Sequence, residues 1–136
     1  MHLKSRFVSE DGSAIVEFVL VAIPLFLPII LFLNSFADVS DKEAIARSLA
    51  RESVRGFALS HGDLAGYSAA QKIATDGGLA LGLSEKEVGS LKVHIRCSSW
   101  PCITPRNRVS ITISFTSSDG HREIRATAEE LLSPWI

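Results

Sequence analysis

Glu17 is the residue of this chain whose position most needs a chemical explanation. It lies at the beginning of a long apolar run, where burying a carboxylate in lipid is costly. An acid in such a place indicates a function, and it needs a partner that offsets its charge. Gly12 lies five residues upstream, at the border between a polar N-terminal segment and this run. The spacing places one acid inside a hydrophobic segment and one glycine at its edge.

Two cysteines, Cys97 and Cys102, form the second candidate site. A disulfide across so short a loop would stabilise the chain modestly and would place this region in an oxidising compartment. A zinc site is disfavoured because two cysteines alone, four residues apart, supply too few ligands. The disulfide is the prediction, and two free buried thiols are the alternative.

Catalytic and metal-binding patterns are missing from the sequence. The four histidines, His2, His61, His94 and His121, are scattered, and there is no nucleophile elbow, phosphate-binding glycine loop or zinc-protease motif. The formal net charge is −1, so no basic excess indicates nucleic acid. We therefore predict a protein that is not an enzyme, with no cofactor, no metal and no nucleic-acid partner.

The element that carries Glu17 is predicted to be a transmembrane helix over residues 13–34. Residues 18–33 read FVLVAIPLFLPIILFL, and their insertion into a bilayer is favourable by roughly −4 to −8 kcal/mol, more than one glutamate costs near an end. A buried soluble helix and a cleaved secretory signal are the alternatives. Pro24 and Pro28, four residues apart, predict a kink.

Residues 35–136 are predicted to form one α+β domain. Residues 34–60 favour an amphipathic helix, either continuous with the span or restarting at the capping box Ser40-x-x-Glu43. On this helix Arg47, Arg51 and Arg55 form a stripe that is interpreted as a solvated face. A second helix is predicted over 63–76, with Gly77-Gly78 as its stop and with these residues near a spacing of 3.6: Leu64, Tyr67, Ala70, Ile73 and Ala74.

The remaining residues have a period of two, which is typical of strands. Alternation around 91–97, 109–115 and 124–128 predicts three antiparallel strands with one apolar face, covered by the two helices. Ser118-Asp119-Gly120 predicts the hairpin between the second and third strands, and Ser84-x-x-Glu87 a capping box for a short turn. The fold class is therefore α+β, with an N-terminal transmembrane helix, a second helix and a small three-stranded antiparallel sheet.

The border segment resembles the class III leader of type IV prepilins, and more narrowly the TadE/TadF-like pseudopilins of tight-adherence (Flp-type) pili. That family opens close to GSAAVEFALVAP. The matching residues here are Gly12, Ser13, Ala14, Val16, Glu17, Phe18, Val21 and Ala22, and Pro24 follows one residue later than usual. The resemblance covers about residues 10–36, and only a general layout beyond them.

The resemblance implies that a membrane aspartyl peptidase cuts between Gly12 and Ser13. Cleavage would leave a largely protonated α-amine on Ser13. Ser13 and Glu17 are an i, i+4 pair on one helix face, so the amine and the carboxylate can neutralise each other within one subunit or between neighbours. Ser13 replaces the aromatic residue of conventional type IV pilins, so methylation of the new N-terminus is not assigned.

The function expected from this resemblance is that of a structural pilin-like subunit. Residues 1–12 would be a cytoplasmic leader, 13–34 the span and 35–136 an extracytoplasmic domain, in the inner (cytoplasmic) membrane or in an extracellular pilus. Expected partners are a prepilin peptidase, other pilins or pseudopilins, the pilus assembly platform and membrane lipid. A plain count of lysine and arginine favours the opposite orientation, but long domains cross regardless of charge. The alternative is an uncleaved, single-pass membrane-anchored interaction domain.

Overall fold

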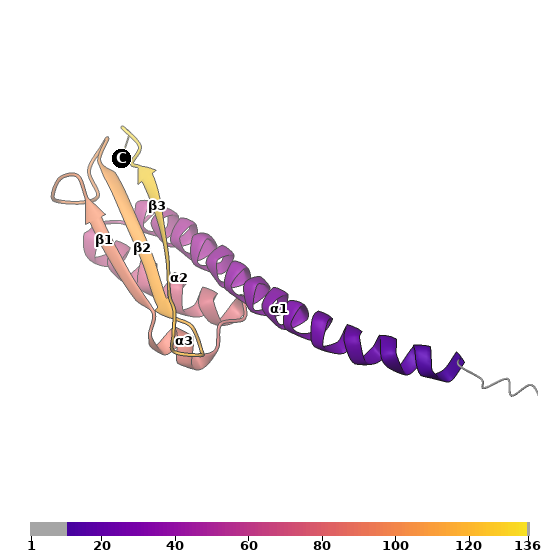
Figure 1. Ribbon diagram of the computed structural model, residues 1–136. Helices are drawn as coiled ribbons and strands as arrows, with labels where there is room; N and C mark the ends of the chain where they lie inside the picture. The colour runs from indigo at the N-terminus through magenta and orange to yellow at the C-terminus, as the bar shows by residue number, and fades with distance from the viewer. Residues whose placement is uncertain (1–10, 136) are drawn as a thin grey trace, which may run out of the picture. The chain divides into compact units, whose positions relative to one another are not determined.

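The computed structural model describes residues 11–135, and the chain divides into two compact units, Met1–Asp38 and Val39–Ile136. The elements, shown in Figure 1, follow one another as α1 (Asp11–Ala58), α2 (Asp63–Ala80), α3 (Glu85–Gly89), β1 (Lys92–Cys97), β2 (Arg108–Thr116) and β3 (Glu123–Leu131). This is the predicted α+β class, with a long apolar N-terminal helix, a second helix and three antiparallel strands.

The first helix is continuous through the segment where a restart was one of two alternatives. α1 runs for 48 residues, and Ser40 and Glu43 lie inside it. The restart at Ser40 is therefore wrong, because inside a continuous helix the amide groups near Ser40 already have carbonyl partners four residues earlier. Pro24 and Pro28 also lie inside α1, and the kink expected there stays a prediction.

The part of α1 that belongs to the second unit has the predicted amphipathic face. Its buried residues are Ala46, Leu49, Ala50, Ser53, Val54 and Phe57. The arginine stripe, Arg47, Arg51 and Arg55, is exposed as interpreted, with one weak i, i+4 pair of 3.5 Å from Arg47 to Glu43. Burial thus separates the two faces as the spacing requires.

Helix α2 packs closely against this part of α1 through glycines. A Cβ placed on Gly66 would lie 2.8 Å from Cδ2 of Phe57, and one on Gly77 would lie 2.9 Å from Cδ2 of Leu49. Phe57 also meets Tyr67 edge to face, with ring centroids 5.5 Å apart. Small residues on α2 therefore make room for large residues of α1, which brings the two helices together.

The predicted end of α2 is wrong. The helix continues through Gly77-Gly78 and ends at Ala80. Its stop is Gly82, which has a φ of +100° and donates to Leu79 O, while Leu83 N donates to Gly78 O. These two hydrogen bonds form a Schellman motif, whose left-handed position favours glycine.

The residues of α2 that share a spacing near 3.6 do not all face inward. The buried residues of α2 are Gly66, Ala70, Ala74 and Gly78, and Ile73 is half-buried. Leu64 is 87% exposed and Tyr67 is 43% exposed. The close approach of α1 excludes bulky side chains from the contact, so the small residues face inward and the leucine does not.

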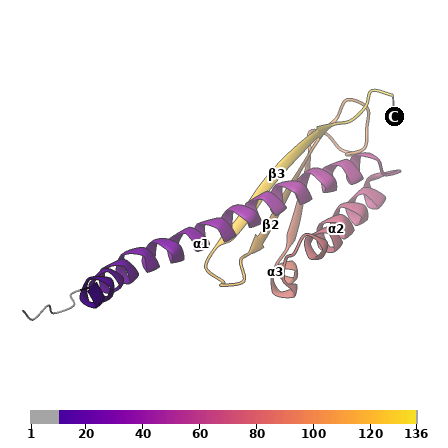
Figure 2. The same ribbon diagram turned by 90° about the vertical axis from the view of Figure 1, so that its right-hand side faces the viewer.

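The sheet has the order β1-β2-β3, and both pairings are antiparallel. Figures 1 and 2 show α2 and the second-unit part of α1 on one face of this sheet. The inward residues of the central strand, Val109, Ile111, Ile113 and Phe115, are almost completely buried, as the alternation predicts. The opposite face carries polar side chains.

The predicted hairpin joins β2 to β3. Ser117 N donates to Arg122 O at 2.8 Å, and Gly120, with a φ of +75°, donates to Ser117 O. The side chain of Asp119 accepts from His121 N at 3.1 Å and from the Ser117 hydroxyl. Asp-Gly therefore supplies the turn chemistry expected of it.

Candidate functional site

The apolar segment of α1 is long enough to cross a membrane and is not covered by protein. Its most apolar 18-residue window has a mean hydropathy of 2.7, and 0% of that window is buried. The large apolar side chains from Ile15 to Phe36 are all exposed. A helix that is hydrophobic all round requires an apolar environment on every side, and a bilayer core of ~30 Å supplies one.

Gly12, Ser13 and Glu17 lie in the first turns of α1. Ser13 and Glu17 are four helical residues apart, which places them one turn apart along the axis. The Glu17 side chain is exposed. The helix thus provides the i, i+4 relation that the predicted pairing of amine and carboxylate needs.

A buried ion pair in the second unit was not found from the sequence. Lys42 of α1 donates to Oε1 of Glu87 in α3, and their side chains are only 13% and 1% exposed. The sequence identified Glu87 as part of a capping box, and that box is present: Glu87 N donates to the Ser84 hydroxyl while Ser84 N donates to Oε2 of Glu87. The two partners are 45 residues apart, so no local spacing indicated Lys42.

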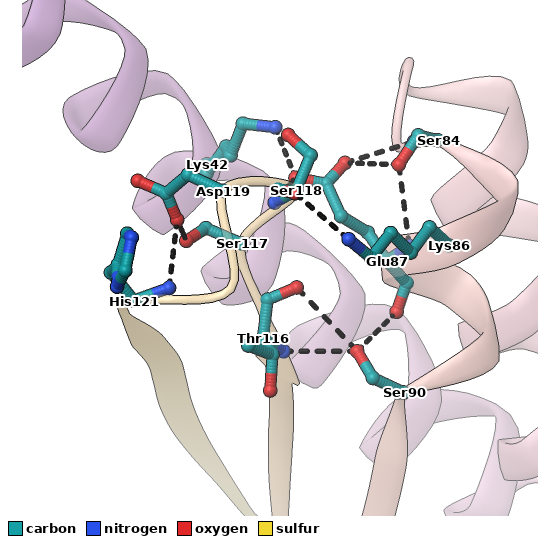
Figure 3. Close-up of polar contacts among 10 residues, drawn as sticks. All are labelled: Lys42, Ser84, Lys86, Glu87, Ser90, Thr116, Ser117, Ser118, Asp119 and His121. Atoms are coloured by element: carbon teal, nitrogen blue, oxygen red, sulfur yellow. Dashed lines mark hydrogen bonds and ion pairs between the residues drawn. The ribbon is translucent and has the colours of Figure 1, made fainter.

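The same carboxylate also holds the β2–β3 hairpin. Ser118 N donates to Oε1 of Glu87 at 3.1 Å, and the Lys86 ammonium donates to Ser118 O at 3.3 Å. Ser90 adds a further contact, because its hydroxyl accepts from Thr116 N at 3.0 Å. Figure 3 shows how these side chains converge. Glu87 therefore fastens α1, α3 and the hairpin to one another.

The surroundings of Glu87 determine its charge. Burial alone would raise the pKa of its carboxyl group, but the hydrogen bonds from Lys42 and Ser84 and the charge of Lys42 lower that pKa to about 2. The group is therefore ionised throughout the physiological range. Its role is structural, because every one of its acceptor positions faces a donor of the fold.

The two cysteines form the predicted disulfide. The bond joins Cys97, at the end of β1, to Cys102, and these are the two cysteines of the sequence. Asp63, the first residue of α2, accepts from Cys102 N and Ile103 N, both at 2.8 Å. The loop between β1 and β2 is therefore held to α2 as well as closed on itself.

Asn107 organises the rest of this loop and was missed by the sequence reasoning. Its side chain is buried, accepts from Ser99 N and Arg108 N, and donates to the carbonyl oxygens of Ser99, Pro101 and Cys102. An asparagine before a strand is a frequent turn residue, so its position alone carried no signal.

Replacing Asn107 by alanine is expected to lower the free energy of unfolding by about 2–3 kcal/mol. The change leaves backbone groups of the loop without their partners in a buried place. Chemical denaturation of the oxidised protein measures this, and Thr104→Ala in the same loop is the control, since Thr104 makes a single exposed side-chain bond. A loss no larger than that of the control would contradict the organising role of Asn107.

An apolar groove of about 550 Å³ lies where α1 ends and β3 ends. Leu59, Leu131 and Trp135 line it and are exposed, together with His61 and Glu130. No group of three or more histidine, cysteine or acidic residues in the described part of the chain is placed to hold a metal ion. The groove offers contact area and no arranged set of reactive groups.

Comparison with known proteins gives no relative on which a family could be based. No family model matches the chain, and neither a curated protein nor a solved structure matches it.

Proposed function

We propose that this chain is a pilin-like structural subunit of the TadE/TadF type, made as a prepilin and anchored by α1. A prepilin peptidase cuts between Gly12 and Ser13, and the mature chain assembles through its apolar helix in a tight-adherence or type IV-like pilus or secretion system. The other partners are further pilins or pseudopilins, the assembly platform and lipid. The domain lies outside the cytoplasmic membrane.

One observation carries this proposal. A glycine at the polar–apolar border is followed, five residues on, by the single acid of the apolar segment 13–34. An uncompensated carboxylate there costs about 3 kcal/mol at mid-bilayer and less near an end. A new α-amine on Ser13, one turn away, supplies the compensating charge.

Two further features support the placement of the domain. The apolar helix has no buried residues in its most hydrophobic window, as an anchor requires. The disulfide Cys97–Cys102 is of a kind that persists in oxidising compartments. An extracytoplasmic domain satisfies both.

Processing tests the proposal. When the full chain is expressed with and without a prepilin peptidase, we expect residues 1–12 to be lost only in its presence, and Gly12→Val to abolish that loss because a branched side chain replaces hydrogen at the cut. Gly89→Ala is the control, since a Cβ at Gly89 meets nothing within 4 Å. Intact mass gives the result, and an uncut wild-type chain in the presence of the peptidase would favour the uncleaved membrane-anchored interaction domain instead.

The acid is tested separately. Glu17→Leu is expected to leave the chain in the membrane but to exclude it from assembled fibres, because the Ser13 amine loses its partner. Leu20→Ala, on the same helix and without charge, is the control. Fibres sheared from cells and probed for the subunit give the readout, and equal incorporation of the Glu17→Leu chain would contradict the role of Glu17.

A further inference from the structure

The sheet has two free edges of opposite charge. On β1 the outward side chains are Lys92, His94 and Arg96, with no acid among them. On β3 the charged residues are Glu123, Arg125, Glu129 and Glu130. Within β3 the one base is already paired, because Arg125 lies 3.1 Å from Glu123, and Glu129 lies 3.9 Å from the exposed Arg108 of β2. One edge is therefore basic and the other has an acidic excess.

Each edge also has backbone groups that the sheet leaves unpaired. Ser98 N donates to Arg108 O, and in an antiparallel ladder every second residue of a strand bonds to its neighbour strand. Val93 and Ile95 are the residues in between, so their amide and carbonyl groups point away from β2. Leu132 N donates to Asn107 O, so Thr127 and Glu129 do the same on β3. Unpaired edges of this kind are templates for an added strand.

The inward side chains at both edges are incompletely covered. Val93 and Ile95 on β1 and Ala126 and Ala128 on β3 are only partly buried, whereas Ile111 between them on β2 is fully buried. A strand added at either edge would extend the apolar face and cover these side chains.

We propose that the edges β3 and β1 of two copies of this chain pair with each other, in parallel, to form a continuous sheet. The inference rests on the membrane anchor of the proposed function and does not depend on cleavage. The common anchor brings copies together in one membrane, and two copies whose apolar faces coincide can join unlike edges only in parallel. β1 and β3 run in the same direction, because each is antiparallel to β2.

In the proposed register the two copies lie at the same level of the sheet. Arg96, Ser110 and Glu129 lie at one level of the sheet, as do Ile95, Ile111 and Ala128. Arg96 of one copy then lies opposite Glu129 of the next, and Ile95 lies opposite Ala128. Lys92 lies opposite Arg125, whose charge is offset by Glu123. In this register the apolar faces of the two copies coincide. The unpaired backbone amide and carbonyl groups of Ile95 then face those of Thr127 and Glu129, the two neighbours of Ala128, which is the pattern of a parallel ladder.

Charge disfavours the competing arrangement at the basic edge. Two β1 edges would bring lysine, histidine and arginine side chains together. Two β3 edges would likewise bring together two strands that each have an acidic excess. The unlike pairing also leaves one edge free at each end, so further copies can add.

Photo-crosslinking of the full chain in the membranes of expressing cells tests this pairing. With p-benzoylphenylalanine at position 94 and two differently tagged copies, we expect links to residues 125–129 of the other copy. Arg96→Glu and Glu129→Arg should each lower the yield by about three-fold or more, and the double variant should restore it, because opposite charges again face each other. Arg51→Glu, on the exposed stripe of α1, should change nothing.

The outcomes are distinguishable from those of the processing test. Links from position 94 to β1 of another copy, links outside the strands, or no links at all would overturn the pairing, as would a double variant that fails to restore the yield. Correct links in a chain that still carries residues 1–12 would support the pairing while contradicting the pilin proposal. Thermal unfolding of each variant checks that the domain is folded.

Discussion

Replacing Lys42 by methionine is expected to lower the free energy of unfolding by about 3–5 kcal/mol. The change removes one partner of an ion pair that is almost completely buried, and it leaves the Glu87 carboxylate in a desolvated place without its counter-charge. The domain is also expected to lose the tie between α1 and α3. Chemical denaturation at neutral pH, with the protein in detergent, measures the effect.

The pH dependence of the same pair provides a second test. Glu87 has a pKa of about 2 in the folded protein, against an ordinary value of 4.5. Its contribution to stability is therefore complete above pH 4.5 and is lost as the pH falls towards 2, by about 3 kcal/mol. In the Lys42→Met variant the pKa of Glu87 rises, so less stability is lost over that range.

An exposed pair of the same chemistry is the matched control. Lys72 and Asp76 form an i, i+4 pair on α2 at 2.9 Å, with both side chains mostly in solvent. Lys72→Met is expected to leave stability nearly unchanged, because water and salt screen such a pair. Equal losses for Lys42→Met and Lys72→Met would contradict the fastening role of Glu87.

Replacing Phe57 by alanine is expected to cost about 3–5 kcal/mol. The ring is fully buried, lies edge to face against Tyr67, and rests on the bare Cα of Gly66. Its removal leaves a cavity between α1 and α2 that the helices can fill only by moving. Denaturation measures the loss, and Leu64→Ala, which truncates a mostly exposed leucine, is the control expected to have little effect.

A double-variant cycle tests whether Gly66 is small because Phe57 is large. Gly66→Ala alone is expected to destabilise, since the new Cβ would lie 2.8 Å from the ring. In the Phe57→Leu background the same methyl group should cost less, because the smaller side chain leaves room for it. Additive effects would show that the close approach of the two helices does not depend on this contact.

The sequence predicted the sheet better than it predicted the helix contacts. Alternation is a local signal with a period of two, so the inward residues of β2 could be identified one by one, and Asp119-Gly120 identified the hairpin. On α2 the spacing near 3.6 predicts a helix but does not show which of its residues face inward. In the structure Gly66 faces inward because it contacts Phe57, and Leu64 faces solvent. This arrangement depends on Phe57, a residue of another helix, so the sequence of α2 alone does not show it.

The difference between local and long-range signals also explains the end of α2 and the buried polar groups. Gly77-Gly78 was predicted as the stop, but of the glycines near the end of α2 only Gly82 has a positive φ, while Gly77 lies against Leu49. The Ser84–Glu87 capping box was visible because its residues are three apart. Lys42 was not, because the hydrogen bond crosses 45 residues. Long-range polar pairs leave no periodic trace in a sequence.

The cysteine pair was predictable as a disulfide because of its isolation and spacing, and the structure contains it. Asn107 and Asp63, which hold that loop in place, were not predicted. Both act on backbone groups of the loop, and any turn residue at their positions would look the same in the sequence.

The N-terminus of the mature protein tests the central claim most directly. Intact mass of the chain, purified from the membranes of its native host and compared with and without reduction, reports the first residue and the state of Cys97 and Cys102 together. We expect a chain that begins at Ser13, with the carboxylate of Glu17 one turn from the new amine, and a mass that rises by two hydrogens on reduction. A chain that still begins at Met1 would contradict this claim.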